Sequence, residues 1–385
     1  MAWNWQQPDW PRFRWDSAAV AAFEAQFLTR AGMQIGALRH FDEETRQSVT
    51  IDVLTGEAVK TSEIEGEILN RDSVQSSILR QFGLETDNRR VPLAERGIAD
   101  MMVDLYRGFA APLTHESLHG WHQLIASGRI DLKDIGAYRT HDDPMQVVSG
   151  PLHKPKVHFE APPSSEMPRQ MDEFLRWFAE TAPDRPHPLP ALTRAGIAHL
   201  YFVSIHPYED GNGRIARAIA VKALEQAIGQ PALLALSHTI QHKRSAYYDA
   251  LEASNKDTEI TGWLQYFSGV VLDGLDATQT LIEFLIAKTK FYDRVRGQIN
   301  ERQERVIKRM FREGPEGFKA GLSAGNYITI TGAARATATR DLHDLVEKGI
   351  FLATGALKYT RYHIALDKGD AASGEGAILS GTRLC

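Results

Sequence analysis

The stretch of this chain that decides its fold runs from His206 to Arg217 and reads HPYEDGNGRIAR. An apolar run from Leu192 to Ile205 precedes it and predicts a buried helix that Pro207 ends. A second run, Arg214 to Ile228, is rich in Ala, Ile and Leu and predicts another helix, which Gly229 stops. The quoted stretch is therefore a loop between two core helices, with its glycines at the start of the second.

The residue types in this loop suit the binding of a phosphate chain. A helix N-terminus presents unpaired N–H groups and the positive end of the helix dipole. Arg214 and Arg217 are three residues apart, so we expect both to point toward the same anion. Asp210 is a candidate ligand for Mg²⁺, which takes one or two carboxylates together with phosphate oxygens. His206 is placed to take a proton from an incoming hydroxyl. The alternative is a purely structural loop with a core histidine and surface arginines.

The stretch resembles the signature of the Fic (filamentation induced by cAMP) family, His-Pro-Phe-x-Asp/Glu-Gly-Asn-Gly-Arg-x-x-Arg. Tyr208 stands in place of the Phe, and the hydroxyl of a buried ring needs a partner or a route to solvent. The resemblance implies transfer of AMP from ATP to a Ser, Thr or Tyr hydroxyl of a protein. It assigns the general base to His206 and the Mg²⁺ to Asp210. It also implies phosphate-binding roles for Gly211, Asn212, Gly213, Arg214 and Arg217.

A second element, TSEIEG, occupies residues 61–66 inside a predicted helix from about Glu44 to Leu69. Thr61 and Glu65 are four residues apart and share a helix face. By itself such a string is typical of a surface helix. Beside the Fic-like loop it resembles the family's inhibitory helix, Ser/Thr-x-x-x-Glu-Gly/Asn. This implies that Glu65 pairs with Arg217 and keeps the γ-phosphate of ATP from its productive place.

A third element, YYDALEASN, spans residues 247–255 and predicts a helix. In similar Fic proteins such a segment walls the adenosine pocket. The resemblance makes Tyr248 and Asn255 candidate adenosine contacts, with Tyr247 second to them. Aromatic packing in the core is the alternative.

Two β-prone runs, Met145–Gly150 and Lys156–Pro163, predict a hairpin. It resembles the Fic flap, which implies that residues 145–163 bind a target protein segment by backbone pairing. A surface hairpin without a role is the alternative.

Composition bounds the remaining possibilities. The net charge of −5 argues against a globally basic nucleic-acid binder. The one cysteine, Cys385, excludes an intrachain disulfide and is compatible with a reducing cytosol. No signal peptide, membrane-spanning run or zinc-ligand spacing is present, so we expect a cytoplasmic protein without zinc.

The expected fold class is mainly α-helical, with a Fic-fold core and a hairpin flap. Four tryptophans, at positions 3, 5, 10 and 15, form an arm that we expect to anchor on its own domain or at a homodimer contact. The expected segments are an N-terminal helical region (1–111), a Fic domain (112–260), a helical connector (261–299), a winged helix-turn-helix (300–368) and a disordered tail (369–385).

The C-terminal segment supports a function of another class, a DNA-binding regulator. Thr339 to Lys348 would form the bulk of its second helix, and Phe351 to Ile364 the wing, with Lys358 and Arg361. Phosphate contacts would come from Arg335, Arg340 and the wing.

The same helix also carries Asp341, Asp344 and Glu347, which favours recruitment of a target protein over DNA binding. Among enzymes, removal of AMP from a target and transfer of another nucleotide are alternatives at the same site. Self-modification is also possible.

Overall fold

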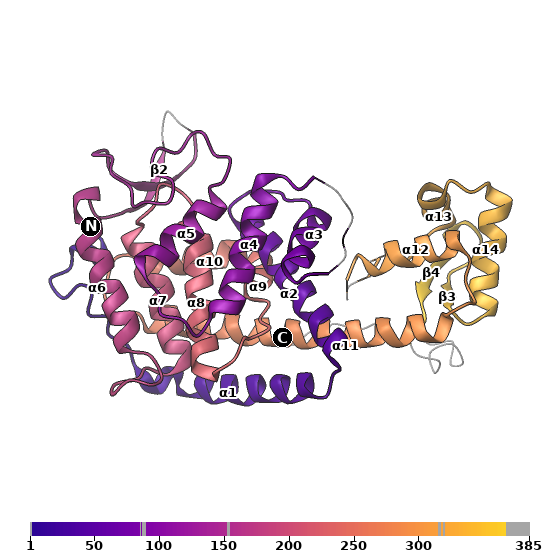
Figure 1. Ribbon diagram of the computed structural model, residues 1–385, viewed down its shortest axis with the longest axis horizontal. Coiled ribbons are helices and arrows are strands. Elements are labelled where there is room, and N and C mark those ends of the chain that lie inside the picture. Colours follow the sequence, from indigo (N-terminus) through magenta and orange to yellow (C-terminus); the bar gives the residue numbers. More distant parts are fainter. Residues whose placement is uncertain are drawn as a thin grey trace. The chain divides into compact units, whose positions relative to one another are not determined.

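Helices α7 (Ala191–Ile205) and α8 (Asn212–Ile228) lie side by side among the helices of the N-terminal part of the computed structural model (Figure 1). They match the predicted pair of core helices, although α8 begins two residues earlier than expected. The structure describes residues 2–84, 86, 90–151, 155–314, 317–318 and 320–366. The chain divides into two compact units, Met1–Thr278 and Gln279–Cys385.

The first unit is mainly helical, as predicted. Besides α7 and α8, it contains the 3₁₀ turns η1 (Asn4–Gln6) and η2 (Ser164–Glu166), the helices α1 (Ser17–Arg39), α2 (Glu43–Ile64), α3 (Arg71–Gln81), α4 (Leu93–Gly108), α5 (His115–Ile125), α6 (Met167–Glu180), α9 (Leu236–His242) and α10 (Arg244–Ser254), and the strands β1 (Gln146–Ser149) and β2 (Lys156–Glu160). Its boundary with the second unit falls within α11 (Thr261–Val295).

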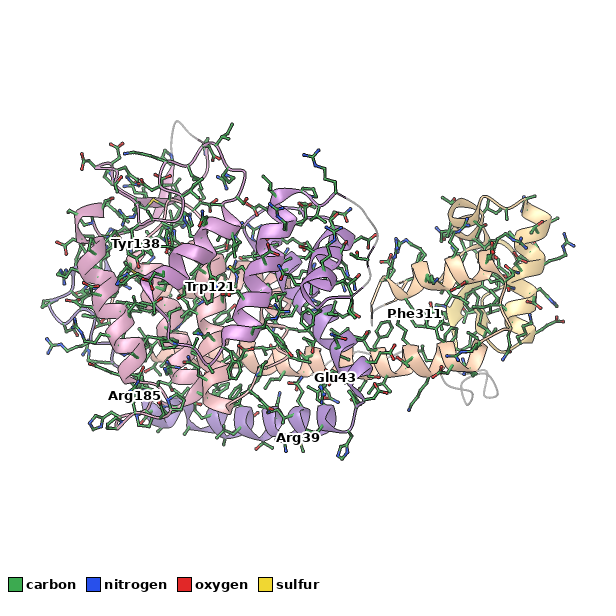
Figure 2. All side chains as sticks on the ribbon, viewed as in Figure 1. Arg39, Glu43, Trp121, Tyr138, Arg185 and Phe311 are labelled. Carbon is green, nitrogen blue, oxygen red and sulfur yellow. The ribbon has the colours of Figure 1, made fainter. Side chains whose placement is uncertain are left out.

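The surrounding helices bury both faces of the central pair. Helices α6 and α1 pack on α7, whereas α4 and α5 pack on α8. The N-terminal helices share one hydrophobic core with the residues from 112 onward, so no boundary between compact units falls at 111. Trp121 of α5 (labelled in Figure 2) donates its indole N–H to Asp104 of α4 at 2.7 Å, which ties these two helices together.

Helix α2 ends at Ile64, five residues before the expected Leu69. The cause is Gly66, which has a φ of +88°. Its N–H donates to Glu63 O and the N–H of Glu67 donates to Ser62 O, both at 3.0 Å. This is a Schellman motif, in which a left-handed residue ends the helix and turns the chain back. Glu65 and Glu67 are therefore presented on a turn at the end of α2.

The predicted flap is present as an antiparallel hairpin of β1 and β2. An irregularity between Val147 and Val148 shifts its register. All four residues of β1 are exposed, whereas Phe159 of β2 is buried.

The N-terminal arm packs against the flap and helix α6. Trp3 stacks edge-on against Phe159, and the indole N–H of Trp10 donates to Gln170 of α6 at 3.0 Å. The arm thus contacts the predicted catalytic segment and does not anchor on its own helical region alone, because its long aromatic side chains reach across to these elements.

The second unit contains α12 (Glu301–Phe311), α13 (Ala324–Thr331), α14 (Arg335–Glu347), β3 (Phe351–Thr354), η3 (Leu357–Tyr359) and β4 (Arg361–Ile364). Strands β3 and β4 pair antiparallel, and Leu322 forms an isolated bridge with Tyr362. Phe311 (labelled in Figure 2) belongs to a core of its own in this unit. The side chain of Lys358 and the predicted tail, 369–385, lie outside the described residues.

Within the described part of the chain, no helix combines the length and apolar character needed to span a membrane.

Candidate active site

The loop between α7 and α8 is held together by its own residues. The side chain of Asn212 accepts from the N–H of Tyr208 at 3.0 Å and donates to the carbonyl of the same residue at 2.7 Å. Gly211 has a φ of +81°, and a Cβ there would lie 2.6 Å from the Cδ1 of Ile125. Both the conformation and the close approach require glycine. In this structure Asn212 shapes the loop, because its amide is engaged with the backbone.

Tyr208, the departure from the family signature, is completely buried. Its hydroxyl lies 3.1 Å from Nδ1 of His119, which supplies the partner that the sequence required. Its ring stacks on His122 with the ring centroids 4.1 Å apart. Tyr138 (labelled in Figure 2) packs edge-on against His119. The extra hydroxyl is thereby accommodated without disturbing the loop.

His206 ends α7 in a left-handed conformation, with φ 53° and ψ 58°. A residue other than glycine rarely adopts this conformation, and when it does it is often at a functional site. Nδ1 lies 3.3 Å from the carbonyl of Val203, which can only accept a hydrogen bond. Nδ1 therefore carries the proton, and Nε2 keeps its lone pair. Burial lowers the pKa of His206 to about 4, so the ring is neutral at neutral pH.

Arg217 binds the end of α2 through three hydrogen bonds. Its Nε donates to Oγ1 of Thr61 at 2.8 Å, and its Nη2 donates to the carbonyl of Thr61 at 3.0 Å and to Oε1 of Glu65 at 2.7 Å. The side chain of Arg217 is only 2% exposed. Burial opposes its charge, yet the Glu65 carboxylate raises the pKa of Arg217 above its ordinary value. Thr61 and Glu65 thus act from one helix face, as their spacing predicted.

The carboxylate of Glu65 lies directly over the first turn of α8. A Cβ on Gly213 would be 2.3 Å from Oε1 of Glu65 and 3.1 Å from Nη1 of Arg217. That Nη1 is buried and, among the described residues, lacks a hydrogen-bond partner. The start of α8 therefore brings together the backbone N–H groups of a first helical turn, a guanidinium N–H that lacks a partner among the described residues, and the carboxylate of Glu65.

Arg214 faces a different set of carboxylates, contrary to the expectation that both arginines point to one anion. Its Nη1 donates to Glu67 at 2.6 Å, and its Nη2 lies 3.4 Å from Oδ2 of Asp210. Arg129 also pairs with Asp210 and holds Asp131 through a second ion pair. The turn after α2 supplies one carboxylate to each motif arginine, which separates their side chains.

Neither Glu67 nor Arg129 was singled out from the sequence. Glu67 follows Gly66 directly, but only the turn at that glycine directs it to Arg214. Arg129 lies about 80 residues before the loop and had no motif to mark it.

Asp210 has the features of a ligand for Mg²⁺. Burial favours its neutral form, but the charge of Arg214 and the hydrogen bond from Arg129 outweigh this and lower the pKa of Asp210. It is therefore an anion at neutral pH. Among the described residues, no group of three or more metal-binding side chains is found. One carboxylate completed by phosphate oxygens is the usual environment of Mg²⁺, so this donor set fits the ion.

The predicted adenosine residues occupy three different environments. Tyr247 is a core residue here, as the packing alternative expected, with its hydroxyl 2.8 Å from Nε2 of His199. Tyr248 is 38% exposed, and its hydroxyl donates to the carbonyl of Ile64 at 3.3 Å. Asn255 donates to the carbonyl of His158 at 2.9 Å, while its Oδ1 is buried without a partner among the described residues.

Arg139 connects the loop to the hairpin. Its Nε donates to the carbonyl of His206 at 2.9 Å and its Nη2 to the carbonyl of Pro162 at 2.5 Å. Pro162 follows β2 by two residues. The buried guanidinium therefore sets the base of the flap relative to His206.

Two family models match this chain. Residues 112–224 match the Fic/DOC family, and residues 3–84 match a domain of unknown function (DUF4172). The chain therefore contains a Fic/DOC domain.

The chain is similar to proteins named protein adenylyltransferase Fic. The protein from Nematostella vectensis is 28% identical over 137 residues, which cover 35% of this chain and 28% of that protein. The protein from Aedes aegypti is 31% identical over 134 residues, which cover 33% and 25%. The matches span about a quarter of the length of these curated relatives.

Solved structures show the fold. A Fic family protein from Desulfovibrio desulfuricans matches 93% of this chain and 98% of its own, with a TM-score of 0.52 at 19% identity. A Fic-domain signalling protein from Bacteroides thetaiotaomicron matches 69% of this chain and 97% of its own, with a TM-score of 0.50 at 19% identity.

Proposed function

We propose that this chain transfers AMP from ATP to a Ser, Thr or Tyr hydroxyl of a protein. The observation that carries the proposal is the juxtaposition of a neutral His206, whose Nε2 is free to accept a proton, with the phosphate-binding start of α8. The relatives named protein adenylyltransferase Fic support the same reaction.

The reaction follows from these positions. The acceptor hydroxyl attacks the α-phosphorus of ATP while its proton passes to Nε2 of His206. The bond from the α-phosphorus to the bridging oxygen breaks, and pyrophosphate leaves. Arg214, Arg217 and the N–H groups of α8 hold the phosphates. Asp210 would hold Mg²⁺, which supplies neutralisation of the phosphate charge.

We further propose that the chain is autoinhibited by Glu65. Its carboxylate is bonded to Arg217 over Gly213, where a phosphate would otherwise use the same guanidinium. A phosphate and Glu65 are both anions, so they compete for Arg217 and repel each other. ATP can still bind, but in a pose that does not align the α-phosphorus.

The hairpin is proposed to align the acceptor segment by backbone pairing. On β2, the outward carbonyls of His158 and Glu160 accept from Asn255 and Trp5. Among the described residues, no segment pairs with the outer edge of β1. This leaves β1 as the edge available to an acceptor.

The test is intact-mass analysis of a Glu65→Gly variant incubated with each nucleoside triphosphate and Mg²⁺. We expect covalent addition of AMP from ATP, and none after His206→Ala in the same background, although that protein still binds ATP. Unchanged mass with every triphosphate would overturn the proposal. Addition of a different nucleotide would identify the alternative transfer reaction.

A second candidate function, binding of duplex DNA, belongs to the second unit. Asp341, Asp344 and Glu347 weighed against it in the sequence, and Glu347 is exposed in the structure. In the structure Asp341 is 7% exposed and bonded to Arg302 and Tyr327, while Asp344 accepts from Gln303. The exposed residues of the first half of α14 are Arg335, Ala336, Thr339 and Arg340. This surface is basic, as contact with phosphates requires.

A further inference from the structure

The N-terminal arm reaches the edge of the candidate active site. Asn4 is completely buried. Its backbone N–H donates to the carbonyl of Asn255 at 2.8 Å, and its Nδ2 donates to Oγ of Ser204 at 2.8 Å. Ser204 lies two residues before His206. One arm residue therefore joins the end of α10 to the end of α7.

The neighbouring tryptophans bind the flap. The indole N–H of Trp5 donates to the carbonyl of Glu160 at 2.7 Å. Trp3 stacks edge-on against Phe159, with the ring centroids 5.3 Å apart, and its own ring lies 3.0 Å from the ammonium of Lys256. These contacts hold the last two residues of β2, one through the carbonyl of Glu160 and the other through the ring of Phe159.

The hairpin depends on such contacts for its order. An isolated two-stranded hairpin is marginally stable in water. Here β1 is exposed along its whole length, so the described contacts that hold the hairpin lie on β2 and at its base. Of these, the contacts at Glu160 and Phe159 come from the arm.

We infer that the arm, residues 3–7, is a positioning element that holds β2 in place beside His206, with Trp5 as its main hydrogen-bond donor to the flap. This assigns a role to the start of the domain of unknown function. The inference concerns the order of the hairpin, and its effect on transfer rests on the proposed function.

The test compares two matched variants by hydrogen–deuterium exchange of the full chain. Trp5→Phe keeps an aromatic ring but loses the N–H that binds Glu160. Trp10→Phe makes the same chemical change in the same arm but loses a bond to Gln170 of α6 instead. We expect amide exchange in β1 and β2 to accelerate about fivefold in Trp5→Phe, as for the loss of one hydrogen bond. Exchange in the hairpin should stay at the wild-type rate in Trp10→Phe.

Two outcomes would overturn the inference. One is a folded Trp5→Phe protein whose hairpin exchanges as slowly as the wild type. The other is equal acceleration in both variants, which would indicate a general loss of stability. Neither readout requires catalysis, so the inference can stand or fall separately from the proposed function.

A second measurement links the arm to the reaction. In a Glu65→Gly background, Trp5→Phe should lower the rate of self-modification at saturating ATP by about tenfold to about a hundredfold, because a misplaced acceptor loses alignment. The KM for ATP should not change, since the phosphate-binding residues are intact. A rise in that KM with an unchanged saturated rate would contradict a role in positioning the flap.

Discussion

His206 combines two properties that a general base needs. The carbonyl of Val203 holds its Nδ1 proton, and burial lowers its pKa to about 4, below its ordinary 6.5. The ring is thus neutral and able to accept a proton over a wider range of pH than an exposed histidine.

This pKa predicts the pH dependence of the reaction. Because the folded pKa is lowered, His206 stays a base above about pH 4, and activity should fall only as the pH drops through that value. The negative charge of Glu65 raises the pKa of His206, so a Glu65→Gly variant should shift this acid limb further down. The measurement is kcat/KM against pH in that variant, with circular dichroism to exclude unfolding. An acid limb near 6.5 would contradict the assignment.

Substitution of Tyr208 should change the stability of the protein but not its transfer activity. Tyr208→Phe removes the hydrogen bond to His119 and restores the residue of the family signature. We expect a loss of about 0.5 to about 1.5 kcal/mol in the free energy of unfolding, measured in urea. Transfer activity should be unchanged, since the hydroxyl points away from the loop toward His119. A large loss of activity in the folded variant would give the hydroxyl a role in the reaction.

At the scale of elements, the proposed inhibition depends on one turn at the end of α2. Gly66 ends the helix in a left-handed conformation and separates two carboxylates, Glu65 and Glu67. The first binds Arg217 and the second binds Arg214. Both motif arginines are therefore held by the same turn.

We expect that removal of the carboxylates of Glu65 and Glu67 relieves the proposed inhibition additively. Glu65→Gly should raise self-modification by about tenfold to about a hundredfold, as expected from the loss of a charged hydrogen bond of about 1.5 to about 3 kcal/mol. Glu67→Gln in the same background should raise it further, because Arg214 is then released. Radiolabelled AMP incorporation measures both rates.

Glu63→Gln is the matched control. Glu63 belongs to the same helix end but pairs with Lys60 and Gln241. The Glu63→Gln substitution should leave the rate of self-modification unchanged. Arg217→Ala should cancel the gain from Glu65→Gly, and a gain that survives it would show that Glu65 acts elsewhere.

At the scale of the whole molecule, the first unit is a composite of sequence segments. The region that matches a domain of unknown function supplies the turn that carries Glu65, and its arm contacts the hairpin of the Fic/DOC domain. The proposed regulation and positioning would thus both come from a segment that carries no catalytic motif. The second unit, with its own core, is available for a separate binding function.

If the second unit binds duplex DNA, the binding by the full chain should depend on the salt concentration. Arg335→Ala with Arg340→Ala should weaken binding and lower the slope of log K against log salt by about 1 for each lost phosphate contact. Arg296→Ala is the control, because this exposed arginine pairs with Asp293. Filter binding at several salt concentrations gives the slope. If neither the Arg335→Ala, Arg340→Ala double variant nor Arg296→Ala changes DNA binding, α14 is not the contact surface.

The sequence alone was sufficient for features that depend on local geometry. The two core helices, the loop between them, the hairpin and the shared face of Thr61 and Glu65 all follow from helical or strand periodicity and from the placement of Gly and Pro. The need for a partner at Tyr208 also follows from its residue type, and His119 meets it.

Tertiary structure alone decided which distant groups meet. Arg129 and Glu67 reach the motif, Arg214 and Arg217 diverge, and the arm crosses to the flap. Asp341 of α14 is buried against Arg302, whereas Glu347 of the same helix stays exposed. Periodicity states which residues share a face, but not which face of another element lies opposite. That choice is made by the packing of the whole core, to which no short motif corresponds.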